Sequence, residues 1–149
     1  MLTLIRTNSD NPAFHSLIRQ LDKELWQRYE SEQAEYDQFN KIENNKTVVL
    51  ATIDHEVIGC GCFKPVDVLT VEIKRMYVKP EHRGKGVAMA IIRELELWAA
   101  GQRFKKVILE TGLRQPEAIA AYKKAGYTLI ENYGPYIGMK NSICMAKLL

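Results

Sequence analysis

A short basic turn with two glycines is the part of this chain that most clearly suggests chemistry. The turn has the sequence Arg83-Gly84-Lys85-Gly86-Val87-Ala88. A strand-like run precedes it, and apolar residues at helical spacing follow it, namely Val87, Ile91, Leu95 and Trp98. The start of a helix has unpaired backbone N–H groups and a partial positive charge. Glycines let a ligand approach those groups, so the turn predicts a bound anion with several oxygens, such as a phosphate or diphosphate.

The turn matches neither of two common nucleotide-binding motifs. It lacks the Lys-Ser or Lys-Thr pair of the P-loop, and it lacks the third glycine of the dinucleotide fingerprint. It does fit the pattern Gln or Arg, two residues, Gly, one residue, Gly or Ala, with Arg83, Gly86 and Ala88 at the specified positions. By itself this pattern is weak, because a solvated loop before a core helix would also satisfy it.

A second motif follows at a suitable distance. Gln115, Ala118, Tyr122, Gly126 and Tyr127 fit the pattern N-x-x-A-x-x-x-Y-x-x-x-G-F/Y except at the first position, where Gln replaces Asn. Pro116 suits the first turn of a helix and Gly126 its C-terminal cap. With both motifs in order, the chain resembles the GNAT family of N-acetyltransferases, most strongly over residues 71–127.

The resemblance implies an α/β (α+β) fold in one domain, residues 1–149. It would have a mixed, mostly antiparallel twisted sheet of about six or seven strands and about four helices. In this family two central strands splay apart around the cofactor, and here they would be Val71–Val78 and Lys106–Glu110. The sequence agrees with this order, because hydrophobic periodicity predicts helices over 12–29 and 87–98 and a hairpin over 47–63. A single strand is expected over 66–78, with a break near Leu69-Thr70, and a last strand over 142–146.

The resemblance also implies acetyl-CoA as cofactor, with coenzyme A as product. The turn from Arg83 to Ala88, including Gly84, Lys85, Gly86 and Val87, would bind the diphosphate. Backbone N–H groups of Met76 and Val78 would bind the pantetheine arm and the thioester oxygen, and Gln115 would bond the arm through its amide. Tyr122 would protonate the departing thiolate.

The base that removes the amine proton is less clearly indicated. Glu72 is the candidate, since it lies on the strand that leads to the cleft. The alternative is a surface carboxylate paired with Lys74 on the same face of that strand.

The acceptor is expected to be a primary amine of a small molecule or peptide. Acidic residues at 30–37 and the tyrosines of Tyr133-Gly134-Pro135-Tyr136 suggest a cationic amine with an apolar body. Equally, an exposed acidic helix and a tyrosine-rich loop need no substrate.

Composition limits the other possibilities. The chain has 149 residues, 46% hydrophobic, with a formal net charge of +3, as expected for one ordinary globular domain without nucleic-acid partners. No membrane span or signal peptide is evident, so a cytoplasmic location is expected, with a homodimer left open. Cys60, Cys62 and Cys144 suit buried free thiols, and no spacing indicates a metal site.

Three functions therefore compete. The first is an acetyl-CoA-dependent N-acetyltransferase. The second is a catalytically inactive module that senses acyl-CoA. The third is a nucleic-acid-binding domain, which is disfavoured because the aromatic residues are not interleaved with the cations.

Overall fold

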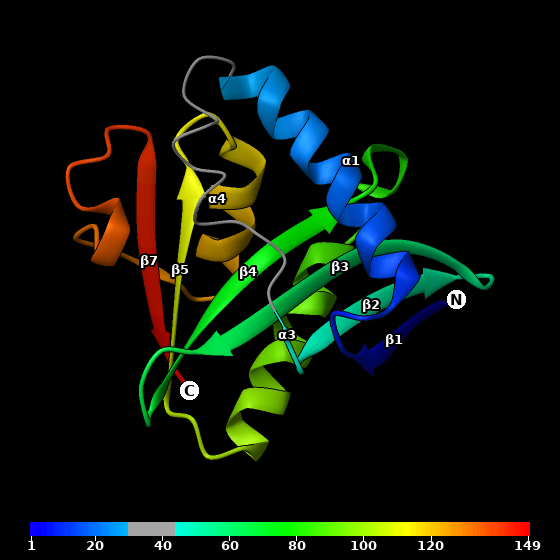
Figure 1. Cartoon of the computed structure of the whole chain (residues 1–149), viewed down its shortest axis with the longest axis horizontal. Coiled ribbons are helices and arrows are strands. Elements are labelled where there is room, and N and C mark those ends of the chain that lie inside the picture. The colour runs from blue at the N-terminus through cyan, green and yellow to red at the C-terminus, as the bar shows by residue number, and fades with distance from the viewer. Residues whose placement is uncertain (30–43) are drawn as a thin grey trace.

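The computed structural model describes residues 1–29 and 44–149 (Figure 1). Its elements follow in the order β1 (Leu2–Thr7), α1 (Pro12–Tyr29), β2 (Val48–Ile53), β3 (Glu56–Pro65), β4 (Thr70–Val78), α3 (Val87–Gly101), β5 (Lys106–Gly112), α4 (Pro116–Lys124), β6 (Thr128–Ile130) and β7 (Ser142–Leu148). Short 3-10 turns cover Pro80–His82 and Gly134–Tyr136.

The strands form one sheet of seven, in the order β1-β2-β3-β4-β5-β7-β6. All neighbours are antiparallel except β4 and β5, which run parallel. The predicted mixed, mostly antiparallel sheet is therefore confirmed. None of the helices within the described ranges is long and apolar enough to cross a membrane.

Helices cover both faces of the sheet (Figure 1). On one face, Phe14, Leu17, Ile18 and Leu21 of α1 pack against β2, β3 and β4 in a cluster that includes Cys60, Cys62 and Tyr77. On the other face, α3 and Tyr122 of α4 share the larger core, which includes Ile91, Leu95 and Leu109. The three cysteines are free and buried, as predicted.

Small residues in β3 let α3 approach the sheet closely. A Cβ atom at Gly61 would lie 2.4 Å from the Met76 sulfur and 3.0 Å from a side-chain carbon of Ile91. Gly59 is similarly close to Ile91 and to the Tyr77 carbonyl oxygen. The start of α3, which carries the basic turn, is thereby held against the β3–β4 pair.

The break expected near Leu69-Thr70 is present, but residues 66–69, which were expected to be strand, are not part of one. Strand β3 continues to Pro65, residues 66–69 form a hairpin turn, and β4 begins only at Thr70. The turn is closed by the Val66 N–H, which donates to the Thr70 carbonyl over 2.8 Å, and by the Asp67 carboxylate, which accepts from the Leu69 N–H over 2.9 Å. An Asp side chain that bonds the backbone two residues on is a turn signal, and it ends the strand here.

Strands β4 and β5 separate partway along their length. Their pairing runs only from Thr70 opposite Lys106 to Ile73 opposite Leu109, although β4 continues to Val78 and β5 to Gly112. Beyond that point β4 stays paired with β3, and β5 stays paired with β7 as far as Gly112. The splay implied by the family resemblance is thus present.

An irregularity in β4 accompanies the separation. The register between β3 and β4 shifts between Cys60 and Cys62, and Arg75 has a φ of +59°. A β-bulge of this kind bends one strand and increases its twist. Consequently β4 turns away from β5 at the level where a gap between them begins.

Candidate active site

A cavity of about 480 Å³ lies beside the separated end of β4. It is bounded by the end of β4, the basic turn, the first turns of α3, one side of α4 and residues of α1. The lining includes Glu24, Met76, Val78, Arg83, Gly86, Gln115 and Tyr122. Two separate sequence motifs and the end of β4, the strand that precedes them, are therefore brought to one cavity.

The basic turn presents open backbone at the start of α3. Gly86 is the N-cap, with a φ of +82° and no side-chain hydrogen bond to the helix start, and Gly84 has a φ of +78°. A Cβ atom at either glycine would have no heavy atom within 4 Å. This arrangement leaves the first N–H groups of α3 available to an anion, which fits the diphosphate of a coenzyme.

The end of β4 offers further N–H groups on the side facing β5. The Lys79 N–H donates to the Ile58 carbonyl on β3 over 2.8 Å. Successive N–H groups along a strand point to opposite edges, so the Val78 N–H points toward β5, and so does that of Met76. Because β5 has separated from β4 at this level, both groups face the gap, which fits the roles expected for Met76 and Val78.

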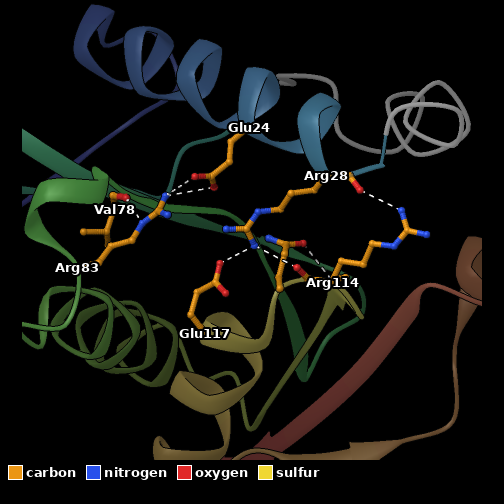
Figure 2. Close-up of polar contacts among 8 residues, drawn as sticks. Glu24, Arg28, Val78, Arg83, Arg114 and Glu117 are labelled. Atoms are coloured by element: carbon orange, nitrogen blue, oxygen red, sulfur yellow. Dashed lines mark hydrogen bonds and ion pairs between the residues drawn. The ribbon is translucent and has the colours of Figure 1, made fainter.

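Arg83 does not extend toward the open turn (Figure 2). Its Nε donates to the Val78 carbonyl over 2.8 Å, and a terminal nitrogen pairs with Glu24 at 2.9 Å. Its guanidinium also lies 5.4 Å from the centre of the Tyr77 ring. The positive charge of Arg83 is thus compensated by Glu24 within the protein. The groups of the turn left to bind a diphosphate are the backbone N–H groups and the exposed ammonium of Lys85.

Gln115 lies at the N-cap of α4 and lines the cavity. Its side-chain oxygen accepts a hydrogen bond from the Gly112 N–H over 3.1 Å. The side-chain oxygen is therefore engaged at the end of β5, and the side-chain NH2 group is the part that would reach a ligand.

Tyr122 projects from α4 to the cavity and is 6% exposed. Its ring meets that of Tyr127 edge to face, with centroids 5.7 Å apart. Burial raises the pKa of Tyr122 well above its ordinary value, and the charge of Glu110 adds to the effect. The hydroxyl therefore keeps its proton at neutral pH, as a general acid must.

Glu72 is buried on β4 but does not line the cavity. It lies in the section of β4 that is still paired with β5, opposite Ile108. Its carboxylate accepts a hydrogen bond from the Tyr133 hydroxyl over 2.6 Å and lies 3.9 Å from the Lys64 ammonium. These contacts engage the carboxylate, so the site does not bring Glu72 together with the other predicted residues.

Glu110 is a candidate that the sequence reasoning missed. Like Glu72 it does not line the cavity, but it is the first residue of β5 beyond the last pair with β4. Its carboxylate accepts a hydrogen bond from the Ser142 hydroxyl over 2.8 Å. The pKa of Glu110 is raised to about 7, chiefly by burial and to a smaller extent by the charge of Glu72, while the hydrogen bond from Ser142 and the charge of Lys74 lower it. The available signal was an acidic residue ending the apolar run Val107-Ile108-Leu109.

Glu110 and Tyr122 approach the gap from opposite faces of the sheet. Val107 and Leu109 belong to the core under α3, and side chains alternate along a strand, so Glu110 points to the other face. Tyr122 belongs to the core under α3, yet the charge of Glu110 acts on its pKa. A buried carboxyl group and a buried tyrosine hydroxyl therefore lie on opposite sides of the place where β4 and β5 part.

The features expected to bind the acceptor are only partly described. The acidic residues Glu30, Glu32, Glu35 and Asp37 lie outside the described residues. Tyr133 and Tyr136 pack edge to face, with centroids 5.7 Å apart, beside the buried Cys144. Through its bond to Glu72, Tyr133 links this aromatic pair to β4.

Ion pairs that the sequence analysis did not predict connect α1 with the elements around the cavity (Figure 2). Besides the Glu24–Arg83 pair, Arg28 pairs with Glu117 of α4 at 2.5 Å. Arg28 and Arg114 also exchange hydrogen bonds, each side chain donating to the other residue's carbonyl, over 3.2 and 3.0 Å. The C-terminal half of α1 is thereby tied to both motif-bearing segments.

Comparison with known proteins identifies the class. Residues 12–127 match the model of the Acetyltransferase (GNAT) family, which is most of the chain. The chain therefore belongs to the GNAT family of N-acetyltransferases. The predictions of fold, family and enzyme class are confirmed.

Individual relatives agree with this assignment over the full length. An IAA acetyltransferase from Azospirillum brasilense is 29% identical over 150 residues, covering 99% of this chain and 98% of that protein. A structure described as an acyl-CoA N-acyltransferase from Klebsiella pneumoniae covers 100% of this chain and 98% of its own, with a TM-score of 0.82 and 27% identity. A GNAT family acetyltransferase from Elizabethkingia anophelis, with acetyl-CoA bound, covers 99% of this chain and 98% of its own, with a TM-score of 0.71 and 20% identity.

A charge placed in the basic turn tests the cofactor assignment. We expect Gly86→Glu to weaken acetyl-CoA binding by at least about 100-fold, because like charges placed side by side cost several kcal/mol. Isothermal calorimetry with acetyl-CoA measures this directly.

Gly138→Glu is the matched control. Gly138 has a φ of +81°, close to that of Gly86, and a Cβ atom there also meets no atom within 4 Å, but the residue does not line the cavity. Both variants carry the same charge and similar backbone strain. Equal affinity in the two variants would remove the turn from the cofactor site.

Proposed function

We propose that this protein transfers the acetyl group of acetyl-CoA to a primary amine on a small molecule or peptide. The observation that carries the proposal is the arrangement around the point where β4 and β5 part: Tyr122 lines the cavity there, and Glu110 is the first residue of β5 beyond the last pair with β4. A buried carboxyl group whose pKa is raised to about 7 and a protonated tyrosine hydroxyl are suited to opposite proton transfers near neutral pH.

The residues around the cavity suit a coenzyme. The turn at Gly84–Ala88 would hold the diphosphate on backbone N–H groups. The N–H groups of Met76 and Val78 would receive the pantetheine arm and the thioester oxygen, as preorganised donors that stabilise developing negative charge. When bound, acetyl-CoA supplies an acetyl group already activated as a thioester.

The two titratable groups would then divide the proton transfers between them. Glu110 takes the proton that the amine nitrogen loses as it forms the new bond to the acetyl carbon, directly or through one water molecule. Tyr122 gives its proton to the sulfur as the carbon–sulfur bond breaks. The products are the amide and free coenzyme A, and a proton exchange with solvent returns both side chains to their starting states.

Glu72 remains the second candidate for the base, in the role first expected from the sequence. Two features favour Glu110 over it: the position of Glu110 where β4 and β5 part, and the engagement of Glu72 by Tyr133 and Lys64. Glu72 would instead support the aromatic pair on the acceptor side.

A panel of amines tests the function as a whole. Release of free thiol from acetyl-CoA is measured with cationic amines, neutral amines and short peptides, each at low and high salt. Turnover with at least one class is expected. A preference for cationic amines that salt removes would support the acidic residues at 30–37 as part of the acceptor site. Tight acetyl-CoA binding without turnover on any amine would favour the acyl-CoA sensor instead.

Removal of one hydroxyl tests the general acid. Tyr122→Phe keeps the ring and its packing, so we expect kcat to fall by about 100-fold or more while acetyl-CoA affinity changes little. Tyr127→Phe is the control, since the Tyr127 hydroxyl donates to Glu96 over 2.8 Å and lies in the same core. If Tyr122→Phe retains kcat within a few-fold, with chemistry limiting the rate, the acid lies elsewhere.

The pH dependence of the rate tests the base. A base works when deprotonated, so kcat/KM should rise with pH and level off above about 7, the pKa of Glu110. We expect Glu110→Gln to lower kcat/KM by about 100-fold or more and to remove that rise. Glu72→Gln, measured alongside, should keep the rise. The reverse outcome would assign the base to Glu72.

A further inference from the structure

Two carboxylates of α1 meet two arginines that flank the Met76–Val78 segment of β4. Asp22 pairs with Arg75 at 2.7 Å, immediately before the segment. Glu24 pairs with Arg83 at 2.9 Å, beyond its other end. In this way one helix holds the segment from both sides, although α1 itself contributes only Leu21 and Glu24 to the cavity lining.

The side chain of Arg83 bonds the main chain of Val78, whose N–H group is one of the two proposed to bind the pantetheine arm and the thioester oxygen. Arg83 donates to the carbonyl of Val78, and the N–H of that same residue faces the gap. A residue in a strand points its N–H and its carbonyl to the same edge. Whatever fixes the direction of the Val78 carbonyl therefore fixes the direction of its N–H.

The contact at Arg75 holds an unfavourable backbone conformation. Arg75 has a φ of +59°, and such a conformation is unusual for a residue with a side chain. Its side chain is 9% exposed, so its charge depends on Asp22 for compensation within the protein. The bulge at Arg75 sets the direction in which the next residue, Met76, presents its N–H.

We propose that Asp22 and Glu24 are positioning residues for acetyl transfer. Through Arg75 and Arg83 they hold the N–H groups of Met76 and Val78 in the direction needed to bind the thioester oxygen. This inference rests on the proposed function, and it adds that α1 controls the geometry of the donors rather than only covering the sheet.

Neutral variants of nearly the same shape test it. Asp22→Asn and Glu24→Gln keep the side-chain length but lose the charge, and hydrogen bonds to charged groups are roughly twice as strong as neutral ones. We expect kcat to fall by about tenfold in each variant, which corresponds to replacing one charged hydrogen bond by a neutral one. The KM for the amine should not change. Glu94→Gln is the control, because Glu94 pairs with Arg6 at 2.7 Å on the far side of the sheet.

A second measurement separates positioning from general loosening. Coenzyme A lacks the acetyl group, so the ratio of acetyl-CoA to coenzyme A affinity reports the contact with the thioester oxygen. This ratio should fall in Asp22→Asn and Glu24→Gln and stay constant in Glu94→Gln. Amide NMR signals of Met76 and Val78 in the ligand-free protein should shift in the first two variants only.

A double-mutant cycle tests whether Glu24 acts through Arg83. Arg83→Gln keeps a donor that can reach Val78 but removes the charge that Glu24 pairs with. Glu24→Gln should have little additional effect in that background. Unchanged kcat, affinity ratio and amide signals in folded Asp22→Asn and Glu24→Gln would overturn the proposal. The affinity and NMR measurements need no turnover, so they decide it even if no amine is acetylated.

Discussion

The separation of β4 from β5 is the constraint on which the rest of the site depends. Two parallel strands in the middle of a sheet ordinarily satisfy each other's backbone groups, and buried unpaired N–H groups are costly. Here each strand keeps a partner on its other edge, β3 for β4 and β7 for β5, so the strands can part without the sheet losing its order. The gap consequently contains backbone donors that no strand uses, and these are what a pantetheine arm with its own amides would pair with.

A gap of this kind needs support from outside the sheet. The bulge at Arg75 bends β4, and α3 packs closely on the neighbouring strand β3 at Gly59, opposite Val78, and at Gly61. Ion pairs from α1 then reach both arginines that flank the open segment. Arg83 illustrates the result: a residue expected to supply charge to a bound anion is instead turned inward, where its Nε donates to the Val78 carbonyl. The glycines beside it, which have no side chains to compete, leave the anion to the backbone.

The features that could be predicted from the sequence are those set by residues close together in the chain. The hairpin of β2 and β3, helix α1 and the N-cap at Gly86 follow from local patterns of β-branched residues, helical spacing and glycines. The break near Leu69-Thr70 was expected, but residues 66–68 were included in the strand because their apolar side chains outweighed the turn signal of Asp67. The pairs Glu24–Arg83 and Asp22–Arg75 join residues more than fifty positions apart, and no local pattern indicates them. Glu110 was missed because its setting depends on where β4 leaves β5, which is a property of the assembled sheet.

The burial of Glu110 makes the stability of the fold depend on pH. Its pKa in the folded protein, about 7, lies above the ordinary value of 4.5. Between these two pH values the folded protein holds a proton that the unfolded chain releases, so the favourable contribution of the protonated group is complete below pH 4.5 and is lost as the pH rises through 7. Above a pH of about 7, the folded protein therefore carries an ionised carboxylate in a buried position. Ser142 and the nearby Lys74 moderate that cost, since both lower the pKa. A substrate ammonium beside Glu110 would lower it further, so arrival of the acceptor itself would favour the charged form that is needed to deprotonate it.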